Sequence, residues 1–104
     1  MNKVKIITVC GSLKFQDEQM RQAERLELEG NAVISVIYPP PNFHKDNYTD
    51  ADVEMLDKMH KVKIDISDAI FVVNVGGYVG SSTKSEIEYA KKLGKEIMWL
   101  EEQI

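Results

Sequence analysis

Short apolar runs alternate along the chain with longer segments in which apolar and polar residues mix. The four runs lie at 4–10, 32–38, 69–75 and 96–100. Most of them are rich in Val and Ile with few interruptions, as is typical of strands covered on both faces, and each predicts a strand. The mixed segments with helical spacing lie at 17–29, 50–66 and 83–93, and each predicts a helix.

Spacing also predicts which side of a helix is buried and where helices begin and end. The expected inward positions are Met20, Ala23 and Leu26 in the first helix and Ile87, Ala90 and Leu93 in the last. Thr49 or Asp50 is expected to cap the amino end of the middle helix. Gly30 and Gly94 follow the other two helices, where glycine commonly adopts the left-handed conformation that ends a helix.

The order strand, helix, strand, loop, helix, strand, helix, strand predicts an α/β protein. We expect a three-layer flavodoxin/Rossmann-like parallel sheet of four to five strands, with helices on both faces and right-handed crossovers. Ligands of such sheets bind beyond the carboxyl ends of the strands, near the switch in strand order. This rule selects residues 10–15, the loop after Tyr38 and residues 74–86 as the expected site.

Composition and charge narrow the class of protein. The 104 residues fit one domain, 1–104, and the content of 29% charged and 43% hydrophobic residues is ordinary for a globular chain. The net charge of -4 and the scattered basic residues argue against a nucleic-acid partner. No apolar stretch predicts a membrane span or a signal peptide. The one cysteine, Cys10, cannot form an internal disulfide, so we expect a cytoplasmic protein.

The first candidate segment runs from Cys10 to Phe15. Gly11 at a strand end lets the backbone approach a ligand closely, and amides at the following helix start attract anions. Ser12 can donate to a phosphate or a sugar hydroxyl, and Lys14 can supply positive charge. The alternative is a tight turn in which Ser12 acts as a cap. Cys10 is expected to be a buried core thiol rather than a nucleophile.

The second candidate segment follows the strongest predicted strand. Three glycines there precede a hydroxyl-rich run that opens a helix. Such a loop can cradle a ribose or a phosphate with its amides and short hydroxyls. The expected ligand-binding residues of this segment are Asn74, Gly76, Gly77, Gly80, Ser82 and Thr83.

Glu86 admits two interpretations. Thr83-Lys84-Ser85-Glu86 matches a capping box, in which the glutamate accepts a hydrogen bond from the amide of the cap residue. In the first helical turn, the same carboxylate can instead face the ligand as a nucleophile or bind a sugar hydroxyl. His60 has basic neighbours and is expected on a helix surface. No group of residues has the spacing of metal ligands, so neither a metal nor another cofactor is predicted.

Three motifs occur in a distinctive order along nearly the whole chain. They are Val9-Cys10-Gly11-Ser12, Ser67-Asp68-Ala69, and Glu86-Ile87-Glu88-Tyr89-Ala90 followed by Gly94-Lys95. Together they resemble the nucleoside 2-deoxyribosyltransferase superfamily, including its small phage and bacterial relatives. The resemblance implies transfer or hydrolysis of the 2-deoxyribosyl group of nucleosides or nucleotides, with Glu86 as the catalytic nucleophile. The family's helper aspartate falls near His60, where this chain has no aspartate, and Glu88 replaces the motif glycine.

A second pattern is similar to another family that cuts N-glycosidic bonds. Gly76-Gly77-x-x-Gly80-x-Ser82-Thr83-x-x-Glu86 resembles the glycine loop of the lysine-decarboxylase-like nucleoside-monophosphate phosphoribohydrolases. The expected function is an enzyme acting on the N-glycosidic bond of a deoxynucleoside or its monophosphate. The alternatives are a nucleotide-binding module without catalysis and a subunit that serves only assembly. Apolar residues of the last helix and strand, among them Leu93 and Trp99, predict a homodimer or higher homo-oligomer.

Overall fold

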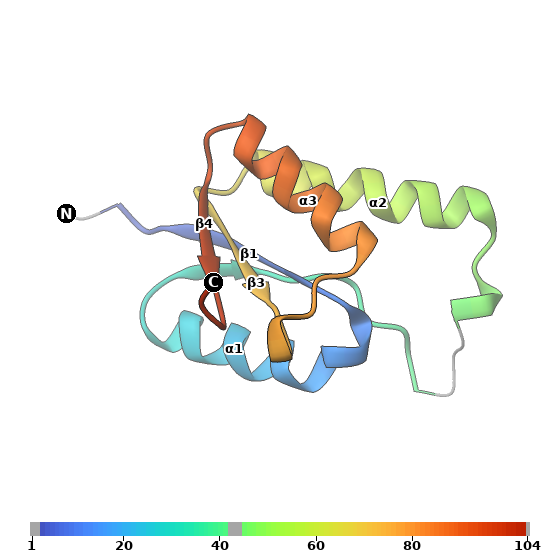
Figure 1. The fold of residues 1–104 in the computed structure, drawn as a ribbon, viewed down its shortest axis with the longest axis horizontal. Coiled ribbons are helices and arrows are strands. Elements are labelled where there is room, and N and C mark those ends of the chain that lie inside the picture. Colours follow the sequence, from blue (N-terminus) through green and yellow to red (C-terminus); the bar gives the residue numbers. More distant parts are fainter. Residues whose placement is uncertain (1–2, 42–44, 104) are drawn as a thin grey trace.

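The computed structural model describes residues 3–41 and 45–103 (Figure 1). The strands in this part of the chain are β1 (Ile6–Gly11), β2 (Ala32–Ile34), β3 (Ala69–Val73) and β4 (Glu96–Trp99). The α-helices are α1 (Gln16–Leu28), α2 (Asp50–Asp65) and α3 (Ser81–Lys92). Short 3-10 helices form η1 (Leu13–Phe15), η2 (Lys45–Asn47) and η3 (Val75–Gly77). The predicted alternation of strands and helices is confirmed.

All strand pairs in the sheet are parallel, in the order β2-β1-β3-β4. The chain moves outward from β1 to β2 and then returns past β1 to β3, so the strand order switches between β1 and β3. This is the order of a flavodoxin-like doubly wound sheet. The switch point lies where Gly11 of β1 pairs with Val73 of β3. The predicted flavodoxin/Rossmann-like fold is confirmed, with four strands in the described ranges.

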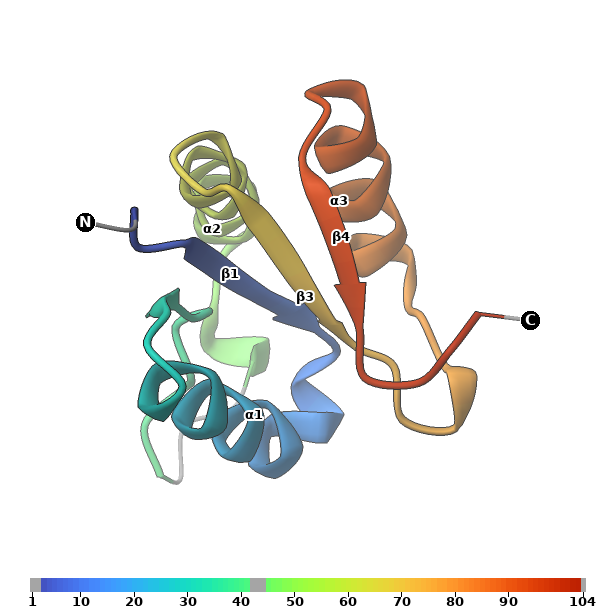
Figure 2. The same ribbon diagram turned by 90° about the vertical axis from the view of Figure 1, so that its left-hand side faces the viewer.

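Helix α1 covers one face of the sheet, and α2 and α3 lie together over the other (Figures 1 and 2). The division follows from the alternation of side chains along each strand. The α1 face buries Ile7, Val9, Leu26, Ala69, Phe71 and Val73. The α2–α3 face buries Cys10, Ile64, Ile70, Val72, Ile87 and Ala90. Strand β3 contributes to both clusters and is buried throughout, which explains its uninterrupted apolar sequence.

Two predicted inward positions are wrong. Met20 is 52% exposed, because the inward face of α1 passes through Gln19 and Leu26, which are both buried. Leu93 is 44% exposed, since it follows α3 as its carboxyl-terminal cap rather than continuing its buried face.

Strand β2 is shorter than predicted, and the glycine caps are as predicted. β2 is an edge strand that pairs only with β1, and its last pair joins Thr8 to Ile34, so the strand ends before the expected residue 38. Gly30 and Gly94 have φ angles of 102° and 73°, the left-handed conformation expected after α1 and α3.

Helix α2 is capped at Thr49, and its first half is exposed. The Thr49 hydroxyl accepts from the Asp52 amide at 3.0 Å, and the Asp52 carboxylate accepts from the Thr49 amide at 3.0 Å. Every side chain from 50 to 59 is exposed, including those of Val53 and Met55, and burial begins at His60. Among the described residues, no helix combines the length and apolar character that a membrane crossing needs.

Candidate functional site

Glu86 lies on the buried side of α3, away from the amino end of the helix. Gly80 is extended, with a ψ of 171°, and the helix begins directly after it without a capping side chain. This start is nearly one turn earlier than a cap at Thr83 would allow. The predicted capping box of Thr83 and Glu86 is therefore wrong, and Glu86 is only 8% exposed.

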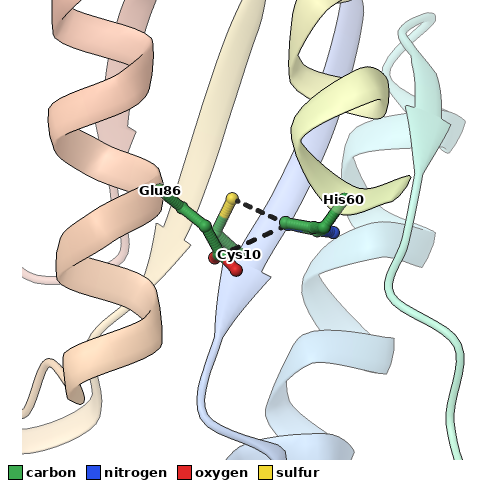
Figure 3. Close-up of side chains that lie close together, drawn as sticks. All are labelled: Cys10, His60 and Glu86. Atoms are coloured by element: carbon green, nitrogen blue, oxygen red, sulfur yellow. Dashed lines mark hydrogen bonds and ion pairs between the residues drawn. The ribbon is translucent and has the colours of Figure 1, made fainter. Parts of the chain in front are cut away.

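Three buried side chains from three elements meet between the sheet and the α2–α3 layer (Figure 3). Cys10 comes from β1, His60 from α2 and Glu86 from α3. The His60 Nε2 lies 3.3 Å from the Cys10 Sγ and 3.6 Å from the Glu86 Oε1. We call these three residues the Cys–His–Glu cluster.

Regular geometry positions each member of this cluster. Cys10 is the penultimate residue of β1 and belongs to the α2–α3 face because its neighbour Val9 belongs to the other. His60 lies four residues before the buried Ile64, so both occupy the inward side of α2. Glu86 occupies the inward side of α3. The cluster thus lies close to the switch point, where this class of fold binds ligands.

Burial dominates the protonation of the cluster. It raises the pKa of the Cys10 thiol well above its ordinary value, and the nearby Glu86 carboxylate adds to the rise. Burial, helped by the positive charge of Lys63, lowers the pKa of His60 to about 4. Burial, helped by the negative charge of Asp57, raises the pKa of Glu86 to about 7. Near pH 7 the cluster therefore holds a thiol, a neutral imidazole and a carboxyl group that exchanges its proton.

Reasoning from the sequence missed His60 and Asp57. The expectation that His60 lies on the helix surface is wrong, since it is 5% exposed. One pattern in the sequence could have predicted the burial of His60. Successive steps of four and three residues lead from it to Ile64 and Ser67, which places all three on one helix face that continues into the turn. Asp57 lies one turn before His60, and its charge raises the pKa values of both His60 and Glu86.

The segment after β1 is a turn closed by its own side chains. Ser12 caps η1, and its hydroxyl accepts from the Lys14 amide at 3.3 Å. Gln19, which is fully buried, donates from Nε2 to the Ser12 carbonyl oxygen at 2.7 Å. A Cβ on Gly11 would lie 3.1 Å from the Gln19 Nε2 and 3.2 Å from the Val73 carbonyl oxygen, so close packing accounts for this glycine. Cys10 is buried, as predicted.

Lys14 joins the two predicted binding segments. Its ammonium group lies 3.5 Å from the ring centroid of Tyr78 and 5.2 Å from that of Phe15. The two rings meet edge to face with their centroids 5.8 Å apart. We call residues 74–80 the glycine loop. The positive charge predicted to meet a ligand is therefore held against two aromatic rings, one in η1 and one in the glycine loop.

The glycine loop is hydrogen-bonded to Glu101, which follows β4. The Asn74 side chain donates to the Glu101 carbonyl oxygen and accepts from the Glu101 amide, both at 2.9 Å. The Gly76 amide donates to the Glu101 carboxylate at 2.7 Å. Gly76 and Gly77 have φ angles of 64° and 81°, a conformation that favours glycine. An amide predicted to bind a ligand anion thus binds a carboxylate of the chain itself.

The remaining predicted residues lie around this edge of the sheet. Ser82 is exposed in the first turn of α3, and Thr83 is buried. An open surface pocket of about 430 Å³ is lined by residues 14–18 together with Arg21 and Val75. Lys14 is the predicted binding residue in this lining, and Glu86 does not belong to it.

Comparisons with known proteins assign no family: no protein-family model and no curated protein matches the chain significantly. The Cys–His–Glu cluster itself offers two kinds of chemistry. Its carboxylate can act as a nucleophile, and its sulfur, nitrogen and oxygen atoms form a group that could hold a metal ion. The spacing along the sequence did not indicate this group, because its members lie far apart in the chain.

Proposed function

We propose that this protein cleaves the N-glycosidic bond of a deoxynucleoside or its monophosphate, with Glu86 as the nucleophile. The observation that carries the proposal is the position of Glu86. It is a buried carboxylate near the ligand-binding edge of a flavodoxin-like sheet, and it takes no part in capping its helix. The resemblance of Glu86-Ile87-Glu88-Tyr89-Ala90 to the nucleophile motif of the 2-deoxyribosyltransferases supports the same role.

The proposed reaction follows the scheme of retaining glycosidases. A Glu86 carboxylate oxygen forms a bond to the anomeric carbon while the bond from that carbon to the base nitrogen breaks. The electron pair leaves with the base, which takes up a proton. A second base or a water molecule then attacks the anomeric carbon, frees the carboxylate and releases its own proton. Attack by a base gives transfer, and attack by water gives hydrolysis.

The surroundings of Glu86 suit a nucleophile that reacts only after losing its proton. Its pKa of about 7 makes the carboxylate the main form only above neutral pH. The imidazole of His60 is neutral there, because its pKa is about 4, so it lies beside the carboxylate without cancelling its charge. We therefore expect activity to rise with pH through about 7.

Substrate binding in this proposal involves the two loops at the same edge. The first contains Gly11, Ser12 and Lys14, and the second is the glycine loop together with Ser82. The Gly76 amide already binds a carboxylate, so the phosphate of a nucleoside monophosphate would compete with Glu101 there.

Chromatographic assay of base release and base exchange, with each deoxynucleoside and its monophosphate, tests the proposal. We expect turnover by the wild type and a loss of at least about 10³-fold in Glu86→Gln, because removing a covalent nucleophile has effects of this size or larger. Glu88→Gln is the matched control, since the Glu88 side chain is 76% exposed on the same helix. The proposal fails if no substrate is turned over, or if Glu86→Gln is as active as the wild type.

A nucleotide-binding module without turnover is the second candidate. The position of the surface pocket favours it, because the lining comes from η1, α1 and Val75 and does not include Glu86. Nucleotides that raise the melting temperature while remaining intact would support this candidate over the enzyme.

The proposal also includes self-association and a cytoplasmic location. The free thiol of Cys10 suits the second of these, because the cytoplasm keeps thiols reduced. Ile87 and Ala90, which contributed to the prediction of a homodimer, are buried within the chain's own core. Leu93 is 44% exposed and remains accessible for a contact between copies. Light scattering of the purified protein gives the mass in solution, and a monomer at all concentrations would refute self-association.

A further inference from the structure

The Cys–His–Glu cluster has a second property that the proposed reaction does not use. The Cys10 Sγ, a ring nitrogen of His60 and a carboxylate oxygen of Glu86 all lie within 4.8 Å of one another. The three residues are buried and come from β1, α2 and α3, so the packing of the fold holds them together. Thiolate sulfur, imidazole nitrogen and carboxylate oxygen are the three donor types of protein zinc sites.

Two of the three separations match those between ligands of one tetrahedral ion, and the third, from the Cys10 Sγ to the Glu86 carboxylate oxygen, lies within 4.8 Å. With Zn–S of about 2.3 Å and Zn–N of about 2.0–2.1 Å, tetrahedral angles place sulfur and nitrogen about 3.5 Å apart. The same construction places nitrogen and carboxylate oxygen about 3.4 Å apart. The observed distances are 3.3 Å from Sγ to Nε2 and 3.6 Å from Oε1 to Nε2. An ion can therefore be accommodated if the Glu86 and Cys10 side chains adjust toward each other around the His60 nitrogen.

We infer that Cys10, His60 and Glu86 together bind one divalent transition-metal ion, for which zinc is the best fit. Binding forms bonds from Sγ, Nε2 and a carboxylate oxygen to the metal, and the protons held by the thiol and carboxyl groups pass to solvent. Thiolate and carboxylate then supply two negative charges against the two positive charges of the ion. The sulfur and nitrogen donors disfavour Mg²⁺ and Ca²⁺, which prefer oxygen ligands.

Three protein ligands leave the fourth position of a tetrahedral ion open to water or to an incoming anion. The metal site is linked to the proposed function, because both use the same glutamate. Metal binding needs no nucleoside, but it uses the carboxylate of the proposed nucleophile, Glu86. A bound ion and a deoxyribosyl group on Glu86 therefore exclude each other, so the metal would inhibit the proposed activity.

Titration of the untagged, chelator-treated protein with Co²⁺ tests the site in the absence of substrate. Co²⁺ binds to zinc-type sites and is visible spectroscopically, unlike zinc. We expect a thiolate-to-cobalt absorption band in the near ultraviolet and strong tetrahedral bands in the visible, saturating at one ion per chain. Added zinc should abolish these bands with the same stoichiometry.

Variants of similar size test each ligand. Cys10→Ser should remove the near-ultraviolet band. His60→Gln and Glu86→Gln should weaken zinc binding by about 100-fold or more, because even residues that only support a metal ligand contribute about 10- to 100-fold. Glu88→Gln, on the exposed side of α3, should bind like the wild type. Circular dichroism checks folding, and the closely isosteric Glu86→Gln keeps the test decisive if another variant does not fold.

The inference is overturned if the wild type gives no cobalt bands, or if Glu86→Gln binds zinc as tightly as the wild type. The metal titration contains no nucleoside, and the base-release assay is run with chelator present. The metal site and the proposed function can therefore fail independently.

Discussion

The two faces of the sheet are built by the same two central strands but differ in what they bury. On the α1 face the core is a cluster of six apolar side chains. On the α2–α3 face, apolar side chains share the interior with the Cys–His–Glu cluster and with a buried hydrogen bond between Thr8 and Ser67. The α1 face thus buries apolar side chains and the neutral amide of Gln19, whereas the α2–α3 face of the described structure also buries ionisable groups.

The comparison teaches that stability and chemistry are divided between the faces by the alternation of a strand. Val9 and Cys10 are neighbours in β1, both fully buried, and they point into opposite layers. The same substitution at these two positions therefore measures the difference between the faces directly.

The largest effect is expected from Val9→Ser, compared with Cys10→Ser. Val9→Ser leaves a hydroxyl without a partner in an apolar cluster and removes buried methyl groups, so we expect a loss of about 3–5 kcal/mol in the free energy of unfolding. Cys10→Ser places its hydroxyl beside the His60 ring nitrogen, which can pair with it, and should lose only about 1 kcal/mol. Urea denaturation measures both. Equal losses would show that the two faces do not differ in this respect.

The next effect concerns pH and arises on the α2–α3 face alone. Glu86 has a pKa of about 7 in the folded protein against an ordinary value of 4.5, so its contribution to stability is lost as pH rises through this range. His60 has a pKa of about 4 against 6.5, so its contribution is lost as pH falls through that range. Each amounts to about 3 kcal/mol, and the two nearly cancel where the ranges overlap.

Single variants should separate these opposing contributions. Relative to the wild type, Glu86→Gln should gain stability as pH rises from 4.5 to 7, because the destabilising ionisation of Glu86 is gone. His60→Gln should lose relative stability as pH rises from 4 to 6.5, because the stabilising contribution of neutral His60 is gone. Urea denaturation at several pH values, with chelator present, gives both curves. Curves of the same sign would contradict the assigned protonation states.

The smallest effect is expected at the start of α2. The first half of this helix buries no side chain, so its end is held mainly by the capping box of Thr49 and Asp52. Thr49→Ala should reduce the free energy of unfolding by about 1 kcal/mol or less and speed amide exchange at the start of α2. Ser82→Ala, in a helix without a side-chain cap, should change stability by less than about 0.5 kcal/mol. A loss from Thr49→Ala as large as that from Val9→Ser would show that α2 is held differently.

The sequence was sufficient to predict the fold because its strongest signals are local. The apolar run of β3 reports burial on both faces, and Gly30 and Gly94 mark helix ends through a conformation that glycine adopts readily. The alternation of elements then leaves few topologies for a parallel sheet. The wrong positions, such as Met20, lie at the edge of a helix face, where one residue of rotation decides exposure.

The candidate site was harder to predict because it depends on contacts between elements. Glu86 is a candidate from the sequence, but local spacing favours a helix cap for it, and the early start of α3 after Gly80 excludes that role. The basic neighbours of His60 predict a surface position for it. Those neighbours are exposed or half-buried, whereas His60 lies on the side of the helix turn that faces the sheet. The meeting of Cys10, His60 and Glu86 depends on how α2 and α3 pack across β1, which no short-range pattern encodes.

The bonds between Glu101 and the glycine loop have a consequence for the order of folding during synthesis. The loop leaves the ribosome before Glu101, yet the Asn74 side chain and the Gly76 amide form their hydrogen bonds with that later residue. Strand β4 must also dock beside β3 to bring Glu101 into place. The sheet can therefore assemble its central strands early, while the loop reaches its final shape only among the last steps of folding.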